Sequence, residues 1–440
     1  MKRDDFDDLA AVDRGVLRFL TCGSVDDGKS TLIGRLLYDT KAILADTLHA
    51  IERTSQRRGL DAVDLSLLTD GLQAEREQGI TIDVAYRYFS TGTRKYIIAD
   101  APGHEQYTRN MVTAASTADL AIIMIDARKG VLTQTRRHSC IAHLLGIPHL
   151  VVAVNKMDLV GWSRDRFEAI RRDYLAFAAK LGIADVRFIP LSALSGDMVV
   201  ERGAQLDWYD GPTLLQILET AATAHAEHAE PFRFPVQYVS RPQTSGFHDF
   251  AADESLDRAG AAARAYMGRV ESGEIAVGDA VQVLPSGQRS RIADIQLNGA
   301  SLPRAVSEQS VTLLLVDEID ISRGDMIVLD GQAPQVTRQI DAVVCWLATD
   351  RLDRSRRYLI RHTTREVRAQ LDVIAHRLDI ATLERVPAGA LQVNDIGRVS
   401  FKLAQPICAD LYADNRITGA FIVIDEASNN TVGAGMIVAG

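Results

Sequence analysis

The segment that most restricts the possible folds is Gly23–Ser30, which reads GSVDDGKS. It matches the pattern G-x-x-x-x-G-K-[ST] and lies between an apolar run at Val16–Thr21 and an amphipathic stretch at Thr31–Leu37. A strand, a glycine-containing loop and a helix in this order form a phosphate-binding loop, because backbone amides at a helix N-terminus attract anions. The motif therefore predicts a nucleotide-binding α/β domain, in which Lys29 reaches the β- and γ-phosphates and the Ser30 hydroxyl binds Mg²⁺.

The rest of the first half alternates short apolar runs with longer amphipathic stretches. The runs read as buried strands at Tyr96–Ala99, Leu120–Ile125, Leu150–Val154 and Arg187–Leu191. The stretches read as helices at Gln134–Leu145, Arg164–Leu181 and Pro212–Ala224. Uninterrupted apolar strands separated by helices predict a mostly parallel sheet with helices on both faces.

The pattern changes after the polar segment His225–Phe234, which reads as a linker. Beyond it, short strands separated by turn signals predict antiparallel β-barrels or sandwiches. These strands are Val236–Val239, Ala280–Leu284, Val311–Val316, Val343–Leu347, Arg368–Ile374, Val399–Leu403 and Phe421–Ile424. A second linker is predicted at Gly331–Val336, whereas Ser245–Ala265 fits either a loop or a short helix.

Charge and cysteine content exclude several classes of protein. The net charge of −9 disfavours broad nucleic-acid coating, and the four cysteines (Cys22, Cys140, Cys345 and Cys408) are too far apart in sequence for a zinc cluster. The N-terminus is acidic and polar, unlike a secretory signal. Apolar runs such as Leu120–Ile125 are much shorter than the roughly 20 residues of a membrane span. We therefore expect a cytoplasmic protein with no membrane or nucleic-acid partner.

Two further motifs follow predicted strands. Asp100–Gly103 reads DAPG; its carboxylate could hold a water on Mg²⁺, and the Gly103 amide could approach the γ-phosphate. Asn155–Asp158 reads NKMD, and the Asp158 carboxylate can accept both N1–H and the exocyclic N–H of guanine. Adenine has no N1–H and no amine beside it at C2, so the motif predicts a preference for guanine. Taken alone, DAPG could equally be an ordinary turn, and a polar loop is the alternative for NKMD, but the order of the motifs along the chain favours a GTPase.

Two candidate catalytic residues accompany Lys29. Thr81 is the candidate Mg²⁺-binding threonine of a switch loop, although it could instead be a threonine that begins a strand. His104 could position the attacking water, although it could instead be a solvent-facing histidine at a helix start.

A fourth segment, Ser192–Leu194, follows the next predicted strand and is predicted to complete the base pocket through backbone contacts. The predicted nucleotide site comprises residues from these four motifs. The predicted GTP-binding residues are Gly23, Ser24, Val25, Asp26, Asp27, Gly28, Lys29, Ser30, Thr31, Asp100, Ala101, Pro102, Gly103, His104, Asn155, Lys156, Asp158, Ser192, Ala193 and Leu194. The predicted Mg²⁺ ligands are Ser30, Thr81 and, through a water, Asp100.

The first half of the chain resembles the translational-factor class of GTPases, which includes elongation factor Tu. The resemblance lies in Asp70–Asp83, Asp100–Met111, Gly130–His138 and the NKMDL sequence that begins at Asn155. Within this class the chain is similar to the GTPase subunit of bacterial sulfate adenylyltransferase in Val283–Ile292, Val311–Asp325 and Asn415–Ile437. The phosphate loop agrees with that assignment, since elongation factors usually have histidine at the position of Asp27 and threonine at that of Ser30.

The resemblance implies a P-loop GTP-binding domain at 1–228 and two antiparallel β-barrel domains at 232–333 and 337–440. It also implies a GTP-hydrolysing subunit that drives ATP and sulfate to adenylylsulfate and diphosphate, in a heteromer with a separate catalytic ATP-sulfurylase subunit. No second phosphate-loop motif follows, so we expect no adenylylsulfate kinase activity. The alternative on the same fold is a translation-factor-type carrier of aminoacyl-tRNA.

Overall fold

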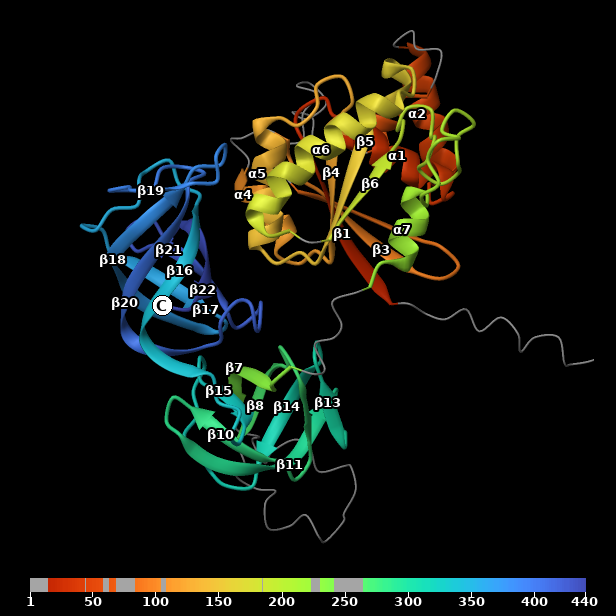
Figure 1. Ribbon diagram of the computed structural model, residues 1–440. Coiled ribbons are helices and arrows are strands. Elements are labelled where there is room, and N and C mark those ends of the chain that lie inside the picture. Colours follow the sequence, from red (N-terminus) through yellow and green to blue (C-terminus); the bar gives the residue numbers. More distant parts are fainter. Residues whose placement is uncertain are drawn as a thin grey trace, which may run out of the picture. The chain divides into compact units, whose positions relative to one another are not determined.

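A computed structural model describes residues 15–43, 45–57, 63–68, 84–103, 108–183, 185–222, 230–240 and 264–440. The chain divides into two compact units, one built on the first half of the sequence and one on the second (Figure 1). Each unit has its own hydrophobic cores.

The described strands of the first unit form a six-stranded sheet in the order β2-β3-β1-β4-β5-β6. Their bounds are β1 (Val16–Cys22), β2 (Ala85–Ser90), β3 (Lys95–Asp100), β4 (Leu120–Asp126), β5 (His149–Asn155) and β6 (Val186–Pro190). Only the edge strand β2 runs antiparallel to its neighbour; the other pairings are parallel. The carboxyl ends of β1, β3, β4 and β5 therefore meet at one edge of the sheet, where ligands bind in open α/β folds.

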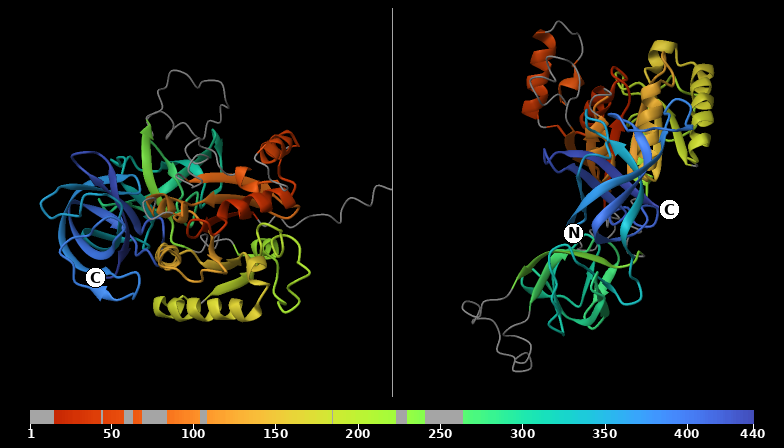
Figure 2. Two further views of the ribbon diagram at one scale, coloured as in Figure 1. Left: turned by 90° about the horizontal axis from the view of Figure 1, so that it is seen from above. Right: turned by 90° about the vertical axis from the view of Figure 1, so that its left-hand side faces the viewer.

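Helices cover the sheet on both faces. Their bounds are α1 (Lys29–Asp39), α2 (Ala45–Arg57), α4 (Thr108–Ala115), α5 (Thr133–Leu144), α6 (Arg164–Leu181) and α7 (Leu214–Thr220), with 3₁₀ turns at Leu65–Leu68 and Met157–Val160. In the views of Figure 2, α2 and α6 lie on opposite sides of the domain.

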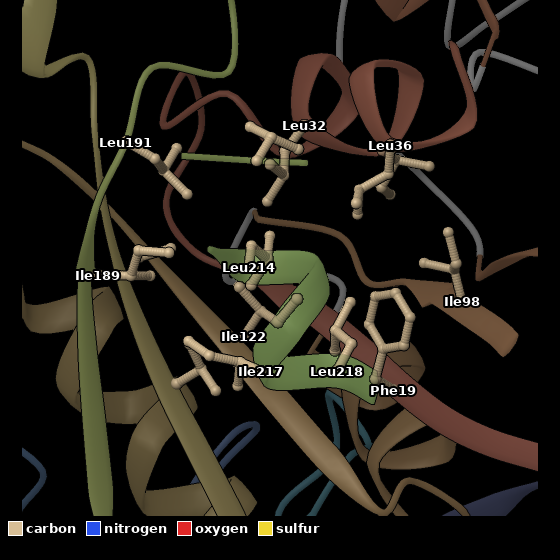
Figure 3. Close-up of a cluster of buried hydrophobic side chains, with 14 of the residues drawn as sticks. Phe19, Leu32, Leu36, Ile98, Ile122, Ile189, Leu191, Leu214, Ile217 and Leu218 are labelled. Atoms are coloured by element: carbon tan, nitrogen blue, oxygen red, sulfur yellow. The ribbon is translucent and has the colours of Figure 1, made fainter. Parts of the chain in front are cut away.

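The burial pattern of β4 explains this layering. All of its residues are buried, and side chains alternate between the two faces of a strand. Leu120, Ile122 and Met124 join a core cluster with α1 and α7, so Ala121 and Ile123 point to the opposite face. Figure 3 shows the first face, where Leu32, Leu36, Leu214, Ile217 and Leu218 of the helices face Phe19, Ile98, Ile122 and Ile189 of the sheet.

The second unit contains two closed antiparallel barrels of six strands each within its described residues. The first closes through β10-β15-β7-β8-β14-β11 and the second through β17-β21-β22-β16-β20-β18. The elements of the first are β7 (Arg233–Ser240), β8 (Ala265–Arg269), β9 (Glu274–Ala276), β10 (Ala280–Leu284), β11 (Gln288–Leu297), β12 (Ala300–Ser301), β13 (Arg304–Val306), β14 (Ser310–Leu315) and β15 (Met326–Leu329). Those of the second are β16 (Gln335–Trp346), β17 (Tyr358–His362), β18 (Arg365–Leu378), β19 (Arg385–Val386), β20 (Ile396–Ala409), β21 (Ala420–Asp425) and β22 (Thr431–Val438).

A buried ion pair joins the two barrels. Arg233 on β7, only 3% exposed, donates from Nε and Nη2 to both carboxylate oxygens of Asp410 at 2.8 and 2.9 Å. A small apolar cluster completes the contact, with Cys408 of the second barrel against Leu284 and Met326 of the first. Separation of the two barrels would leave each of these buried charges without its partner, which is unfavourable. The ion pair therefore favours a fixed packing of the two barrels.

The predicted architecture, a P-loop α/β domain followed by two antiparallel β-barrels, is confirmed. Three predicted elements need correction. The linker expected at His225–Phe234 ends earlier, since β7 begins at Arg233. The helix expected at Pro212–Ala224 runs only from Leu214 to Thr220. The Thr213 hydroxyl caps its start by accepting from the Gln216 amide at 3.3 Å, and Ala221 has extended backbone angles directly after its end. The linker expected at Gly331–Val336 ends earlier, since β16 begins at Gln335. The residue limits predicted for the three domains remain predictions, and most of the Ser245–Ala265 segment lies outside the described residues.

Candidate nucleotide-binding site

The phosphate loop connects β1 to α1 and depends on glycine at two positions. Gly28, the N-cap of α1, has a backbone φ of 94°, which residues other than glycine rarely adopt. A Cβ on Gly28 would lie 2.4 Å from Asn155 Nδ2, and one on Gly23 would lie 2.8 Å from Met124 Cβ. The loop is therefore packed closely against the ends of β4 and β5.

Lys29 is buried beneath this loop. Its Nζ donates to the carbonyl oxygens of Gly23 and Ser24 at 3.0 and 2.9 Å. Burial lowers the pKa of Lys29, while the negative charges of Asp100 and Asp27 oppose that change. The amine thus lies at the centre of the loop, where it could bind phosphate oxygens in exchange for the two carbonyls.

The DAPG segment lies directly beside the phosphate loop. Asp100 ends β3 opposite Thr21 of β1, whose hydroxyl donates to Asp100 Oδ1 at 3.2 Å. Gly103 approaches so closely that a Cβ there would be 2.5 Å from Lys29 Nζ and 2.7 Å from the Gly23 carbonyl oxygen. The structure thus brings together two motifs that are separated by about seventy residues in the sequence.

Substitution of Gly103 with alanine tests this close approach. The added methyl must displace Lys29 or the loop backbone, so we expect GTP hydrolysis to fall on the order of a hundredfold. The measurement is the rate of phosphate release from GTP, with the thermal unfolding temperature as a check on folding. Gly92→Ala is the matched control, because a Cβ on Gly92 would meet no atom within 4 Å. Equal hydrolysis by the two variants would contradict the role of Gly103.

Asn155 connects the phosphate loop to the Ser192–Leu194 loop, which we call the base-reading loop. Its Nδ2 donates to the Asp27 carbonyl oxygen at 2.7 Å, and its Oδ1 accepts from the Ala193 amide at 2.9 Å. On the other side, the guanidinium of Arg35 on α1 donates to the carbonyl oxygens of Ala193 and Leu194. The Ser192–Leu194 loop is therefore held from two directions.

Asp158 presents an unsatisfied acceptor in this region. Its Oδ1 is buried and accepts no hydrogen bond from the residues that the structure describes. A buried carboxylate oxygen without a donor is unfavourable, and the adjacent N1–H and exocyclic N–H of guanine would supply the missing donors. The residues therefore fit a guanine base, as the NKMD motif predicts.

Comparison with known proteins gives the family. Residues 14–226 match the model of the elongation factor Tu GTP binding domain, and residues 339–438 match that of the GTP-eEF1A C-terminal domain-like family. The sulfate adenylyltransferase subunit 1 of Cellvibrio japonicus is 54% identical over 426 residues, which cover 96% of this chain and 86% of that protein. This chain belongs to the sulfate adenylyltransferase subunit 1 family.

Two other relatives agree with this assignment. The sulfate adenylyltransferase subunit 1 of Citrobacter koseri is 51% identical, covering 98% of this chain and 87% of that protein. The bifunctional enzyme CysN/CysC of Mycobacterium tuberculosis is 52% identical, covering 96% of this chain and 67% of that protein. The predicted resemblance to the sulfate adenylyltransferase GTPase subunit is confirmed, and so is guanine-nucleotide binding by the first domain.

The site of this family member also contains residues that no sequence motif indicated. Asp126 at the end of β4 is buried and accepts from Arg128 Nε at 3.0 Å and Nη2 at 2.6 Å, and its Oδ2 lies 3.1 Å from Lys156 Nζ. Burial favours the neutral acid, but the hydrogen bonds from Arg128 and Lys156 outweigh it and hold the pKa of Asp126 below its usual range. Lys156, at a φ of 63°, also donates to the Asp26 carbonyl oxygen. The available signal was a carboxylate at the end of a parallel strand, as at Asp100.

Thr81 and His104 lie outside the described residues, so their roles in Mg²⁺ binding and water activation remain predictions. The roles of the other predicted site residues are likewise predictions, although the structure brings the phosphate loop, Asp100–Gly103, Asn155–Asp158 and Ser192–Leu194 together. Within the described part of the chain, no helix is both long and apolar enough to cross a membrane.

Proposed function

We propose that this chain, as the GTPase subunit of sulfate adenylyltransferase, couples GTP hydrolysis to the formation of adenylylsulfate on a separate catalytic subunit. Family membership supports the activity, and the partner is proposed because the relatives are named as one subunit of that enzyme. The structural observation that carries GTP binding is the junction at Asn155, which holds the phosphate loop and the base-reading loop in one site.

The reaction needs a source of free energy. A sulfate oxygen attacks the α-phosphorus of ATP, and the bond between that phosphorus and the bridging oxygen breaks to release diphosphate. Sulfate is a poor nucleophile, and the mixed phosphoric–sulfuric anhydride lies uphill of the reactants. Hydrolysis of GTP to GDP and phosphate by this chain would supply the missing driving force.

This chain's own groups would bind and orient the GTP. The amides of the phosphate loop and the Lys29 amine would hold the phosphates, and Asp158 would select the base. Ser30 and Thr81, with Asp100 acting through a water, would hold Mg²⁺, which neutralises phosphate charge when bound. His104 would orient the attacking water. A change in the segment 60–83 and in the helix after Gly103 would carry the nucleotide state to the partner.

The first test is the rate of GTP hydrolysis by the purified chain, alone and then with the catalytic subunit, ATP and sulfate. We expect a slow basal rate that rises only in the full mixture, together with GTP-dependent release of diphosphate. A rate of GTP hydrolysis that is the same with and without the partner and sulfate would contradict the coupling. A GTP-dependent complex with charged tRNA would instead favour the carrier function.

A further inference from the structure

Asp27 is an unusual residue for a phosphate loop, because its carboxylate has the same sign of charge as the ligand. The side chain folds back within the loop, where Oδ2 accepts from the Ser24 amide at 2.6 Å. A Cβ on Gly23 would be 3.1 Å from the same oxygen, so the carboxylate lies against the first turn of the loop. The Ser24 bond fixes the shape of the loop.

The other carboxylate oxygen, Oδ1, is buried and has no hydrogen-bond partner among the described residues. The Asp27 residue as a whole is 1% exposed. The charges that act on it are Lys29 in the loop, Lys129 after β4, and Asp126 at the end of β4. Burial raises the pKa of Asp27 to about 6, and the two lysines oppose that change. At about pH 7.5 the group is therefore largely ionised.

A buried negative charge changes the field inside the loop. Asp27 offsets part of the positive charge of Lys29, with which it interacts electrostatically. Because the Asp27 carboxylate is buried, its repulsion of a phosphate is screened much less than repulsion between two exposed charges. The loop then holds anionic nucleotide less tightly than its amides and lysine alone would allow.

We propose that the buried charge of Asp27 weakens guanine-nucleotide binding and speeds the release of GDP, while its bond to the Ser24 amide preserves the loop. This inference rests on the proposed binding of GTP at this loop. It gives the chain a means of exchanging spent nucleotide without help from another protein. The γ-phosphate adds charge, so the effect on GTP affinity should equal or exceed that on GDP affinity.

Asp27→Asn separates the two roles of the side chain. Its amide oxygen can still accept from the Ser24 amide, but the charge is gone. We expect release of a fluorescent GDP analogue to slow on the order of tenfold, with a matching gain in affinity at equilibrium. Asp27→Ala loses both the charge and the bond, so it should release the analogue faster than Asp27→Asn does.

Asp165→Asn is the matched control, since it removes the same charge from an exposed residue in the first turn of α6, outside the predicted nucleotide site. Its effect should be smaller, and should shrink in about 0.5 M salt while that of Asp27→Asn persists. Release from Asp27→Asn as fast as from the unmodified chain would overturn the inference. If Asp27→Asn unfolds at a clearly lower temperature than the unmodified chain, Asp27→Ser, which is also neutral, takes its place. Release from Asp27→Ser as fast as from the unmodified chain would then overturn the inference. Failure of the unmodified chain to bind the analogue would instead contradict the proposed function.

Discussion

Lys29→Ala is expected to lower GTP hydrolysis by about a hundred- to a thousandfold, because the variant loses the cation that stabilises charge on the transferred phosphoryl group. Lys29 Nζ is held between the carbonyl oxygens of Gly23 and Ser24, so it is already directed into the loop. The measurement is the rate of phosphate release from GTP, with and without the catalytic subunit, ATP and sulfate. GTP-dependent diphosphate release should disappear together with hydrolysis.

Two controls separate this effect from a loss of structure. Lys180→Ala removes the same charge from an exposed position near the end of α6 and should hydrolyse GTP normally. Association of the Lys29 variant with the catalytic subunit should stay measurable, because Lys29 is buried within the nucleotide site and offers little surface to a partner. Full GTP-dependent stimulation of the Lys29 variant would refute the role of Lys29.

The residues that sequence could identify are those whose chemistry is local. The phosphate loop, DAPG and NKMD each combine a strand end with a diagnostic set of side chains within a few positions. The hydrogen bonds of Asn155, in contrast, could not be predicted from neighbouring residues in the sequence. Its two bonds reach Asp27 and Ala193, which are 128 and 38 residues away, and they depend on the order of strands in the sheet.

Asp126 and Arg35 escaped prediction for the same physical reason. Asp126 lies beside Asn155 through the register of β4 and β5, which brings Lys156 within reach of its carboxylate. Arg35 contributes only because α1 packs beside the Ser192–Leu194 loop. Neither position carries a sequence signal beyond a charged residue near an element end.

The barrel strands show a second limit. Strand β22 reads TVGAGMIV, and its glycines weigh against a strand by intrinsic preference. A Cβ on Gly435 would lie 2.2 Å from the ring of Phe421, so the glycine makes room for an aromatic ring on the adjacent strand β21. Long-range packing thus overrides local preference, and alternation of apolar residues identified only part of each barrel.

Asp158→Asn is expected to change the base preference of the site from guanine to xanthine. The substituted side chain would offer an amide N–H where guanine also has donors, so we expect GTP affinity to fall on the order of a hundredfold or more. Xanthine has a carbonyl oxygen in place of the exocyclic amine, so xanthine nucleotides should gain affinity. Asp158 Oδ1 supports this role, because it accepts no hydrogen bond from the described residues that a base would have to displace.

The decisive measurement is diphosphate release by the complex of the Asp158 variant with the catalytic subunit, driven by either GTP or xanthosine triphosphate. The variant should respond to xanthosine triphosphate and lose its response to GTP, whereas the unmodified chain should do the reverse. Asp165→Asn, in the first turn of α6, removes the same charge from an exposed site and should keep the guanine preference. Unchanged GTP affinity in the Asp158 variant would count against base recognition by this carboxylate. A complex driven by xanthosine triphosphate would, in contrast, tie the energy source of sulfate activation to the nucleotide bound by this chain.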